Sequence, residues 1–309
     1  MTDAQMRGVY AIPPTPFTAE GALDLDGLGR VVRFCLEAGV PGLVAPVNAS
    51  EFPFLSDDER RRVVEVVVAE AAGRARVVAG VSGTSTEHAL LFARHAREVG
   101  ADAVIAMPPY VRTAGRDEIR TYFEAVAREA RLPVFIQNHL PPQGTVLSPA
   151  LVAGLVNGID GVSYVKEETW PPGQHMTETM RLCGPRLRGI MGGIAGRYLI
   201  DEHRRGSCGT MPACEVADVH VQVWDRLEAG DADGARRLFN ALLPLLNLEA
   251  IHGVALYKHV LHRRGLIDSP VVRQPGLWAL DDLDRREVDA VLAELSTLFR
   301  VPGAELRPA

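Results

Sequence analysis

The stretch TSTEHALLFARHAREVGADAVIAM, residues 84–107, contains one complete helix-and-strand unit. Thr84-Ser-Thr-Glu87 has the spacing of a capping box, in which side chains satisfy the free backbone donors of a helix's first turn. Gly100 stands where this helix should end, because glycine accepts the left-handed conformation common at helix C-termini. Asp102-Ala-Val-Ile-Ala-Met107 is a short apolar run typical of a buried strand. These residues predict a helix followed directly by a strand.

Short apolar or β-branched runs recur along the first 211 residues. Eight of them are candidate strands, at residues 8–12, 42–47, 76–81, 102–107, 133–137, 161–166, 187–191 and 208–211. Helical patterns separate these runs, with a second capping box at Ser56 and Glu59 and further terminal glycines at Gly39 and Gly73. Parallel strands need crossover helices, and closure removes the exposed edges of the sheet. The sequence therefore predicts an α/β fold, a (β/α)8 TIM barrel over residues 1–211.

An open, doubly wound sheet is the alternative architecture. The glycine-rich strand exits at residues 80–83 and 192–196 do not match the nucleotide-binding or nucleophile motifs of such sheets, which favours tight barrel loops. Beyond Met211 the strand signal stops, and helical patterns follow at residues 215–227, 231–247, 252–264 and 283–299. We expect residues 212–309 to form a C-terminal helical appendage packed on the barrel.

Composition excludes several classes of function. The chain has 309 residues with a net charge of −6, which provides no electrostatic attraction for nucleic acid or an anionic membrane. No apolar run approaches the ~20 residues of a membrane span. The four cysteines form no CxxC pair, which indicates a reducing compartment, and we expect a cytoplasmic protein. No group of residues has metal-ligand spacing, so we expect neither a metal nor another cofactor.

Lysine is almost absent from this chain. Only Lys166 and Lys258 are lysine among 33 basic residues. Arginine can serve as a solvated cation but cannot offer a free amine, whereas a desolvated lysine can become a nucleophile. Lys166 ends the strand at residues 161–166, where apolar neighbours favour the neutral amine. Its alternative role is that of a surface cation paired with a glutamate, and Lys258, in a helical pattern, is interpreted as a packing or surface residue.

Polar residues gather where the predicted strands end, which is where TIM barrels carry their catalytic groups. Tyr164, Lys166 and Glu168 share one face of their strand because side chains alternate. The turn Asn48-Ala49-Ser50 after the second strand can offer backbone N–H groups and a hydroxyl to a carboxylate. The candidate set is completed by Gln137, Asn138 and His139 after the fifth strand and by Gly192 after the seventh.

This combination resembles the dihydrodipicolinate synthase / N-acetylneuraminate lyase superfamily of Schiff-base barrels. The matching motifs are Thr15-Pro16-Phe17, the strand-two turn that ends in Glu51, Met107-Pro-Pro-Tyr110 and Val165-Lys166-Glu167. The resemblance implies that Lys166 attacks the ketone of a small 2-oxo acid and that the strand-two turn holds the acid's carboxylate. It also implies a homo-oligomer, either a dimer or a tetramer.

The chain departs from the usual superfamily pattern at four points. Asn48-Ala49 stands where two hydroxyl residues are usual, and Gln137 stands where the family has a catalytic tyrosine on strand five. Val111 replaces a tyrosine that reaches into a neighbouring subunit, and Pro142 lies near the position of a substrate-binding arginine. A synthase of lysine biosynthesis is therefore not expected.

Three short motifs resemble instead the branch of the superfamily that contains 2-keto-3-deoxy-L-arabonate dehydratase. They are Asn48-Ala-Ser-Glu51, Gln137 and Tyr164-Val-Lys166-Glu-Glu168. This likeness implies dehydration of a 2-keto-3-deoxy sugar acid, with Glu168, Tyr164 or His139 as the proton shuttle. A pyruvate-dependent aldolase or hydratase-aldolase remains the alternative, since Phe52, Phe54 and Trp170 would suit a bulky aldehyde half. A non-catalytic binding protein on the same scaffold is a third possibility.

Overall fold

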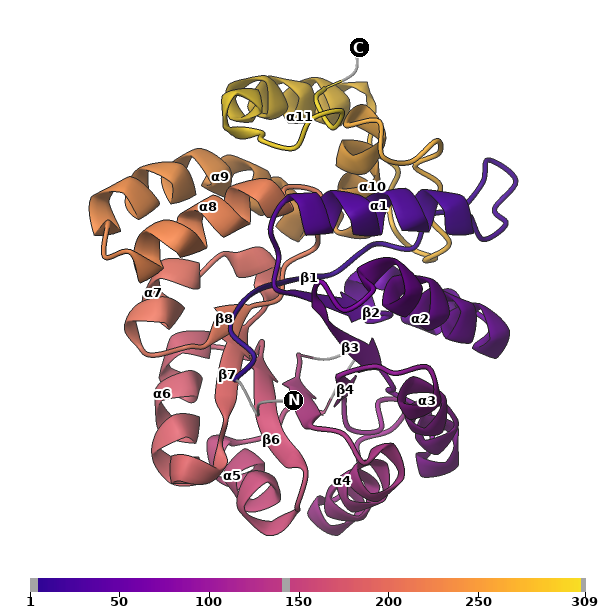
Figure 1. The fold of residues 1–309 in the computed structure, drawn as a ribbon, viewed down its shortest axis with the longest axis vertical. Coiled ribbons are helices and arrows are strands. Elements are labelled where there is room, and N and C mark those ends of the chain that lie inside the picture. Colours follow the sequence, from indigo (N-terminus) through magenta and orange to yellow (C-terminus); the bar gives the residue numbers. More distant parts are fainter. Residues whose placement is uncertain (1–4, 141–144, 307–309) are drawn as a thin grey trace. The chain divides into compact units, whose positions relative to one another are not determined.

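A computed structural model of the chain describes residues 5–140 and 145–306, so Pro142 lies outside the described residues. Eight parallel strands follow one another in chain order around a closed barrel, and Figure 1 labels all of them except β5. They are β1 (Gly8–Ala11), β2 (Gly42–Ala45), β3 (Arg76–Gly80), β4 (Ala103–Ala106), β5 (Val134–Asn138), β6 (Val162–Glu167), β7 (Gly189–Gly192) and β8 (Gly209–Thr210). Each lies within or overlaps a predicted strand, and the predicted (β/α)8 barrel is confirmed.

Helices alternate with these strands and continue beyond the last one. They are α1 (Leu25–Glu37), α2 (Asp57–Ala71), α3 (Thr86–Glu98), α4 (Arg116–Ala130), α5 (Pro149–Gly158), α6 (Pro172–Cys183), α7 (Leu199–Arg204), α8 (Ala217–Glu228), α9 (Ala232–His252), α10 (Val254–Arg263) and α11 (Asp282–Leu295). The four helices after β8 correspond to the four helical patterns predicted there. Within residues 5–140 and 145–306, every helix is too short or too polar to cross a lipid bilayer.

Two predicted helix starts had different outcomes. Helix α2 begins with the predicted capping box, in which Ser56 accepts from the Glu59 backbone and the Glu59 carboxylate accepts from the Ser56 backbone. The predicted box at Thr84 is wrong, because α3 begins one residue later and Ser85 is its N-cap. Gly39, Gly73 and Gly100 each follow the C-cap of their helix with a positive φ, as expected of terminal glycines.

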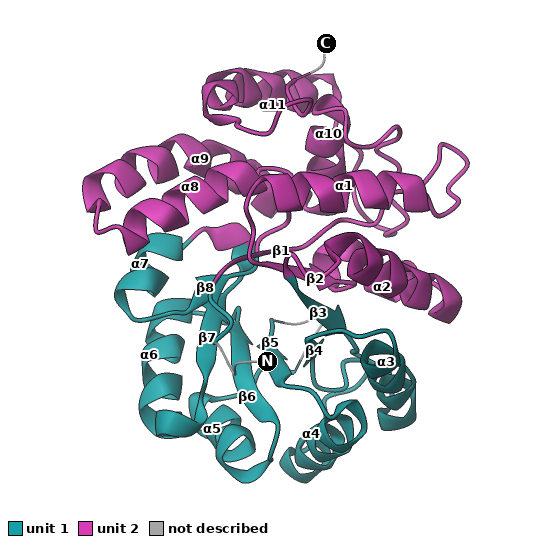
Figure 2. Ribbon diagram, viewed as in Figure 1, with its two compact units in different colours: residues 1–7, 76–194, 198–211 teal, residues 8–75, 195–197, 212–309 magenta. Residues whose placement is uncertain are grey.

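The chain divides into two compact units, coloured teal and magenta in Figure 2. The first comprises residues 1–7, 76–194 and 198–211 and contains β3 to β8 with α3 to α7. The second comprises residues 8–75, 195–197 and 212–309 and contains β1, β2, α1, α2 and the last four helices. Within the second unit α8 packs against β1. The domain boundary expected at residue 211 stays a proposal.

The register between neighbouring strands determines which side chains lie beside each other in the first unit. Gln137 of β5 lies beside Lys166 of β6, and Lys166 lies beside Met191 of β7. One residue further along, Asn138, Glu167 and Gly192 form the next row. Side chains in neighbouring rows point to opposite faces of the sheet because strand residues alternate. Gln137 and Lys166 therefore share one face, while Asn138 and Glu167 share the other.

Candidate active site

Lys166 is a buried amine near the end of β6. The residue is 3 % exposed, and its Nζ lies 3.0 Å from Oε1 of Glu168, which is itself 6 % exposed. A surface ion pair would be far more exposed, so the interpretation of Lys166 as a rim cation is wrong. The structure instead brings together an amine and a carboxylate that are both shielded from water, which strengthens their interaction.

Two protein groups hold the Glu168 carboxylate in addition to Lys166. The Gln137 side-chain amide donates to Oε2 at 2.8 Å, and the backbone N–H of Ile194 donates to Oε1 at 3.2 Å. Gly193 makes room for the carboxylate, since a Cβ at this glycine would lie 2.2 Å from Oε1. Gln137 is thus a partner of Glu168, and the glycine-rich loop after β7 forms one wall of the carboxylate's site.

Opposing effects set the ionisation of Glu168. Burial raises its pKa, whereas the charges of Lys166 and His139 and the hydrogen bonds from Gln137 and Lys166 lower it, and the net pKa is about 2. Glu168 is therefore a carboxylate at neutral pH. Because the Lys166 charge is the largest lowering effect, neutralising that amine leaves burial to raise the carboxylate's affinity for a proton. Glu168 is placed to accept a proton from Lys166.

Asn138 and Glu167 belong to a second polar network on the opposite face of the strands. The Asn138 amide donates to the Leu147 carbonyl at 2.9 Å and to Glu167 at 3.0 Å, and it accepts from the Leu147 N–H at 2.8 Å. Glu167 also accepts from the Thr169 backbone at 2.8 Å and from its hydroxyl, which contacts His175 at 2.6 Å. These bonds occupy Asn138 within the protein, so the structure argues against Asn138 as a substrate ligand.

Tyr164 lies two residues before Lys166 on the same strand. Its ring stacks on Phe135 with centroids 4.5 Å apart, and its hydroxyl accepts from the Met6 backbone N–H at 3.1 Å. The residue is completely buried. These contacts favour a structural role in the barrel interior, and the mechanism proposed below does not use Tyr164.

His139 directly follows β5 and is half-buried. Its Nδ1 lies 2.8 Å from the Leu140 carbonyl, and the ring acts electrostatically on Glu168. This arrangement leaves His139 a candidate for proton transfer near the carboxylate.

Gly192, the last residue of β7, makes room for a carboxyl group that the sequence analysis missed. A Cβ at Gly192 would lie 1.9 Å from Oε2 of Glu202, which comes from α7. Glu202 is fully buried, and neither of its oxygens has a hydrogen-bond partner among the described residues. Burial, with smaller contributions from the neighbouring carboxylates, raises its pKa to about 8. Glu202 is therefore a neutral acid at pH 7. The sequence feature that relates to it is Gly192, whose missing Cβ leaves space for this carboxyl group.

The strand-two turn lies in the second unit and is tightly bonded. Asn48–Ser50 forms a single 3-10 turn, and the Glu51 backbone N–H closes it on the Asn48 carbonyl at 3.0 Å. The Ser50 hydroxyl donates to the Pro13 carbonyl at 2.8 Å, and the Thr15 hydroxyl donates to the Ser50 carbonyl at 2.7 Å. The hydroxyl of Ser50 and its backbone N–H, which donates to the Val47 carbonyl at 2.8 Å, are thus used within the protein, so a ligand at this turn depends on donors that precede Ser50.

Comparisons with known proteins find similar proteins over nearly the whole chain. A model of the dihydrodipicolinate synthetase family matches residues 5–295. The chain is 31% identical over 296 residues to L-2-keto-3-deoxyarabonate dehydratase of Azospirillum brasilense, covering 94% of this chain and 95% of that protein. It is 30% identical to 4-hydroxy-tetrahydrodipicolinate synthase of Chelativorans sp. (strain BNC1), covering 94% and 99%. The crystal structure of dihydrodipicolinate synthase from Rhodopseudomonas palustris superposes with a TM-score of 0.86 at 30% identity, covering 94% and 98%.

Proposed function

Since the chain belongs to the dihydrodipicolinate synthetase family, it is a lyase of the lysine Schiff-base class, and we propose that it dehydrates a 2-keto-3-deoxy sugar acid. Family membership confirms the resemblance inferred from the sequence. The observation that carries the proposal is the Glu168 carboxylate, held 3.0 Å from the Lys166 amine by an amide and a backbone N–H. Glu168 supplies a proton acceptor beside the imine carbon without a strand-five phenol.

The first stage forms the imine. Glu168 takes a proton from the Lys166 ammonium, and the free amine adds to the C2 carbonyl of the substrate. Glu168 returns this proton to the departing C2 oxygen, so loss of one water leaves a protonated imine between C2 and Lys166 and restores the Glu168 carboxylate. We assign the substrate's carboxylate to the turn Asn48–Ser50, including Ala49, by the family resemblance and by the bonding of that turn.

The second stage removes the C4 hydroxyl. The protonated imine acidifies the C3 hydrogen, and Glu168 removes it to give an enamine. Glu168 or His139 then protonates the C4 hydroxyl, which leaves as water. As it leaves, the electrons of the enamine form the C3–C4 double bond. A water molecule then hydrolyses the imine and restores Lys166, so the net change is the loss of one water.

Gln137 favours dehydration over the synthase and aldolase reactions. An amide has no accessible ionisation, so it cannot relay a proton as a phenol does. Here its amide hydrogen is donated to Glu168 instead. Overall identity does not discriminate between these reactions, because the relatives named as a dehydratase and as synthases are 31% and 30% identical to this chain. The side chains around Lys166 are the better guide.

An aldolase or hydratase-aldolase is the second candidate, and one observation favours it. Trp170, half-exposed just after β6, packs edge-to-face against Tyr198 with ring centroids 5.5 Å apart. A half-exposed tryptophan packed on a tyrosine suits a planar or bulky aldehyde half. A non-catalytic binding protein is disfavoured by the buried pair of Lys166 and Glu168, which a binding role does not need.

Product analysis tests the proposal. Purified protein should convert a 2-keto-3-deoxy pentonate to a dehydrated semialdehyde without releasing pyruvate, measured with a lactate dehydrogenase-coupled assay beside semialdehyde detection. Glu168→Gln should slow this on the order of 10²-fold. Glu178→Gln is the control, because Glu178 forms an exposed ion pair with Arg181 on the surface of α6. Stoichiometric pyruvate would establish the aldolase instead, and an active Glu168→Gln variant would remove Glu168 from the mechanism.

Two further properties belong to this proposal. We expect a homo-oligomer, a dimer or tetramer, whose active sites are complete within one subunit, because Val111 cannot supply a cross-subunit phenol. We also expect the protein to act in the cytoplasm, which is consistent with Cys35, Cys183, Cys208 and Cys214 being buried free thiols.

A further inference from the structure

The second lysine of the chain is as deeply buried as the first. Lys258, on α10, is completely buried, and its Nζ donates to the Glu51 carboxylate and, at 2.8 Å, to the Val271 carbonyl. The ammonium also lies 4.0 Å from the centre of the Phe17 ring. The prediction of a packing or surface lysine missed this ion pair, which joins residues 207 positions apart in the sequence.

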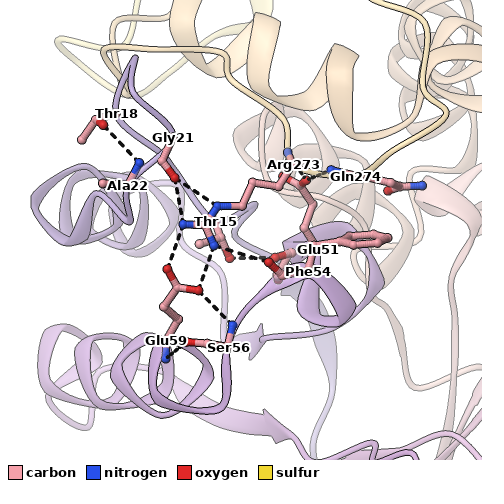
Figure 3. A network of polar contacts seen from close by, with 11 residues as sticks. Thr15, Thr18, Gly21, Ala22, Glu51, Phe54, Ser56, Glu59, Arg273 and Gln274 are labelled. Atoms are coloured by element: carbon pink, nitrogen blue, oxygen red, sulfur yellow. Dashed lines mark hydrogen bonds and ion pairs between the residues drawn. The ribbon is translucent and has the colours of Figure 1, made fainter.

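Glu51 connects this ion pair to the strand-two turn. It follows the turn Asn48–Ser50 directly and adopts a left-handed conformation, with φ 58° and ψ 33°, that is unfavourable for a residue with a Cβ. Its carboxylate accepts from Lys258 and from the backbone N–H groups of Arg273 at 2.7 Å and Gln274 at 2.8 Å, as Figure 3 shows for the last two. These three donors hold Glu51 in that conformation, and its own N–H closes the turn.

Arg273 anchors the segment that supplies these backbone donors. Its two terminal guanidinium nitrogens each donate one hydrogen bond of 2.8 Å to a different oxygen of the Glu59 carboxylate. The guanidinium also donates to the Gly21 carbonyl at 2.8 and 3.1 Å. The guanidinium also lies 4.1 Å from the centre of the Phe17 ring, so the same ring contacts both cations. The segment 271–274 is thereby fixed against the turn and the start of α2.

We propose that Glu51, Lys258 and Arg273 are positioning residues that hold the turn Asn48–Ser50 in the conformation that receives the substrate's carboxylate. This inference rests on the proposed function, which assigns the substrate's carboxylate to this turn. The turn carries Asn48 and Ala49 in place of two hydroxyl residues, and its Ser50 hydroxyl already donates to Pro13. The Ser50 backbone N–H also donates within the protein, to the Val47 carbonyl at 2.8 Å, so recognition depends on donors of the turn that precede Ser50, and their directions are set by the backbone conformation that Glu51 enforces.

The arrangement predicts an effect on carboxylate recognition that is separate from the chemistry at Lys166. Removing one member of a buried ion pair leaves the other charge uncompensated, so we would remove both charges together in Glu51→Gln/Lys258→Met. Arg273→Gln is a milder second variant that retains the backbone donors to Glu51. Arg263→Met is the control. Arg263 lies on α10, as Lys258 does, and this change breaks its 2.8 Å pair with Asp289 of α11 rather than a contact of the turn.

The readout is borohydride trapping of the Lys166 imine with pyruvate and with methyl pyruvate, followed by intact mass at several ketone concentrations. Pyruvate carries the carboxylate, and the ester lacks its charge. Wild-type protein should be half-saturated at a lower concentration of pyruvate than of the ester. In the double variant the half-saturating pyruvate concentration should rise by at least ~10-fold, with the limiting trapping rate and the ester's behaviour within about threefold of wild type.

Each outcome decides a different claim. An equal loss with both ketones would mean that the three residues only stabilise the fold, and unchanged half-saturation with pyruvate in both variants would also overturn the inference. If wild-type protein itself does not distinguish pyruvate from its ester, the assignment of the turn as the carboxylate site fails, and the inference fails with it. A shift with Arg263→Met equal to that of the double variant would show a general response to lost ion pairs.

Discussion

Gly193→Ala is a single-methyl change that should displace the Glu168 carboxylate. The new Cβ would lie 2.2 Å from Oε1 and 2.5 Å from Cδ of Glu168, whereas ordinary van der Waals contacts begin at 3.4 Å. The oxygen must therefore move by about 1.2 Å, the difference between 3.4 and 2.2 Å. Gly193 is not among the residues with positive φ, so alanine is compatible with the backbone and the effect falls on the side chain.

This displacement should cost activity rather than folding. Glu168 lies 3.0 Å from Lys166, so a shift of this size removes the carboxylate from hydrogen-bond geometry with the amine. A misplacement of ~1 Å in a reacting group costs on the order of 10²-fold in rate, and we expect that loss in kcat/KM for dehydration of the keto-deoxy acid. Adding Glu168→Gln to Gly193→Ala should cause little further loss, because both changes remove the same interaction.

The matched control is Gly154→Ala, in the middle of α5, where nothing lies within 4 Å of the new Cβ. This variant should keep full activity and gain about 0.5–1 kcal/mol of stability, since glycine weakens a helix interior. Steady-state kinetics and thermal unfolding would be measured on all three variants. If folded Gly193→Ala retained activity within about threefold of wild type, the position of Glu168 beside Lys166 would not matter for the reaction.

Three other predictions concern imine formation, pH and assembly. Borohydride with pyruvate should add one covalent mass that maps to Lys166 and is absent in Lys166→Arg; labelling that persists in this variant would remove Lys166 as the nucleophile. Glu202 has a folded-state pKa raised to about 8 from 4.5, so its neutral form contributes stability that is complete below pH 4.5 and is lost as pH rises through 8. The loss should be about 1.4 kcal/mol per pH unit across that window, a few kcal/mol in total, and urea unfolding from pH 5 to 9 should show a shallower decline for Glu202→Gln; an unchanged slope would contradict the assignment of a buried neutral acid. Finally, Lys166→Arg and Glu168→Gln subunits mixed and reassembled should recover no activity, whereas complementation would indicate sites shared between subunits.

Much of the fold was predictable because its signals are local. Each barrel strand is a short apolar run between turn residues, and each helix carries its own capping residues, so neighbours in the sequence carry the information. The one-residue error at α3 has the same origin. Thr84 and Ser85 are both competent caps, and only the observed backbone, extended at Ser85 with φ −138°, decides that Ser85 accepts from His88.

The core of the site was also accessible from the sequence. Alternation along one strand puts Lys166 and Glu168 on the same face, whereas the register that puts Gln137 beside Lys166 is given by the folded barrel. The same alternation correctly orients Tyr164, but it does not reveal that the Tyr164 hydroxyl bonds to Met6, 158 residues earlier in the chain. Side-chain direction is a local property, whereas the partner at the end of the side chain is not.

The remaining contacts were decided by the tertiary structure alone. Glu51 meets Lys258 across 207 residues and the Arg273 backbone across 222, and no periodicity relates such positions. The missing Cβ of Gly192 leaves space for the Glu202 carboxyl group, and that of Gly193 leaves space for the Glu168 carboxylate. These contacts form only when the helices and strands have packed together. The sequence by itself determined the barrel and predicted Lys166 as the reactive lysine with Glu168 on the same face, because these depend on spacing within single elements. The partners that orient them depend on which distant segments pack together, and that is a property of the folded chain.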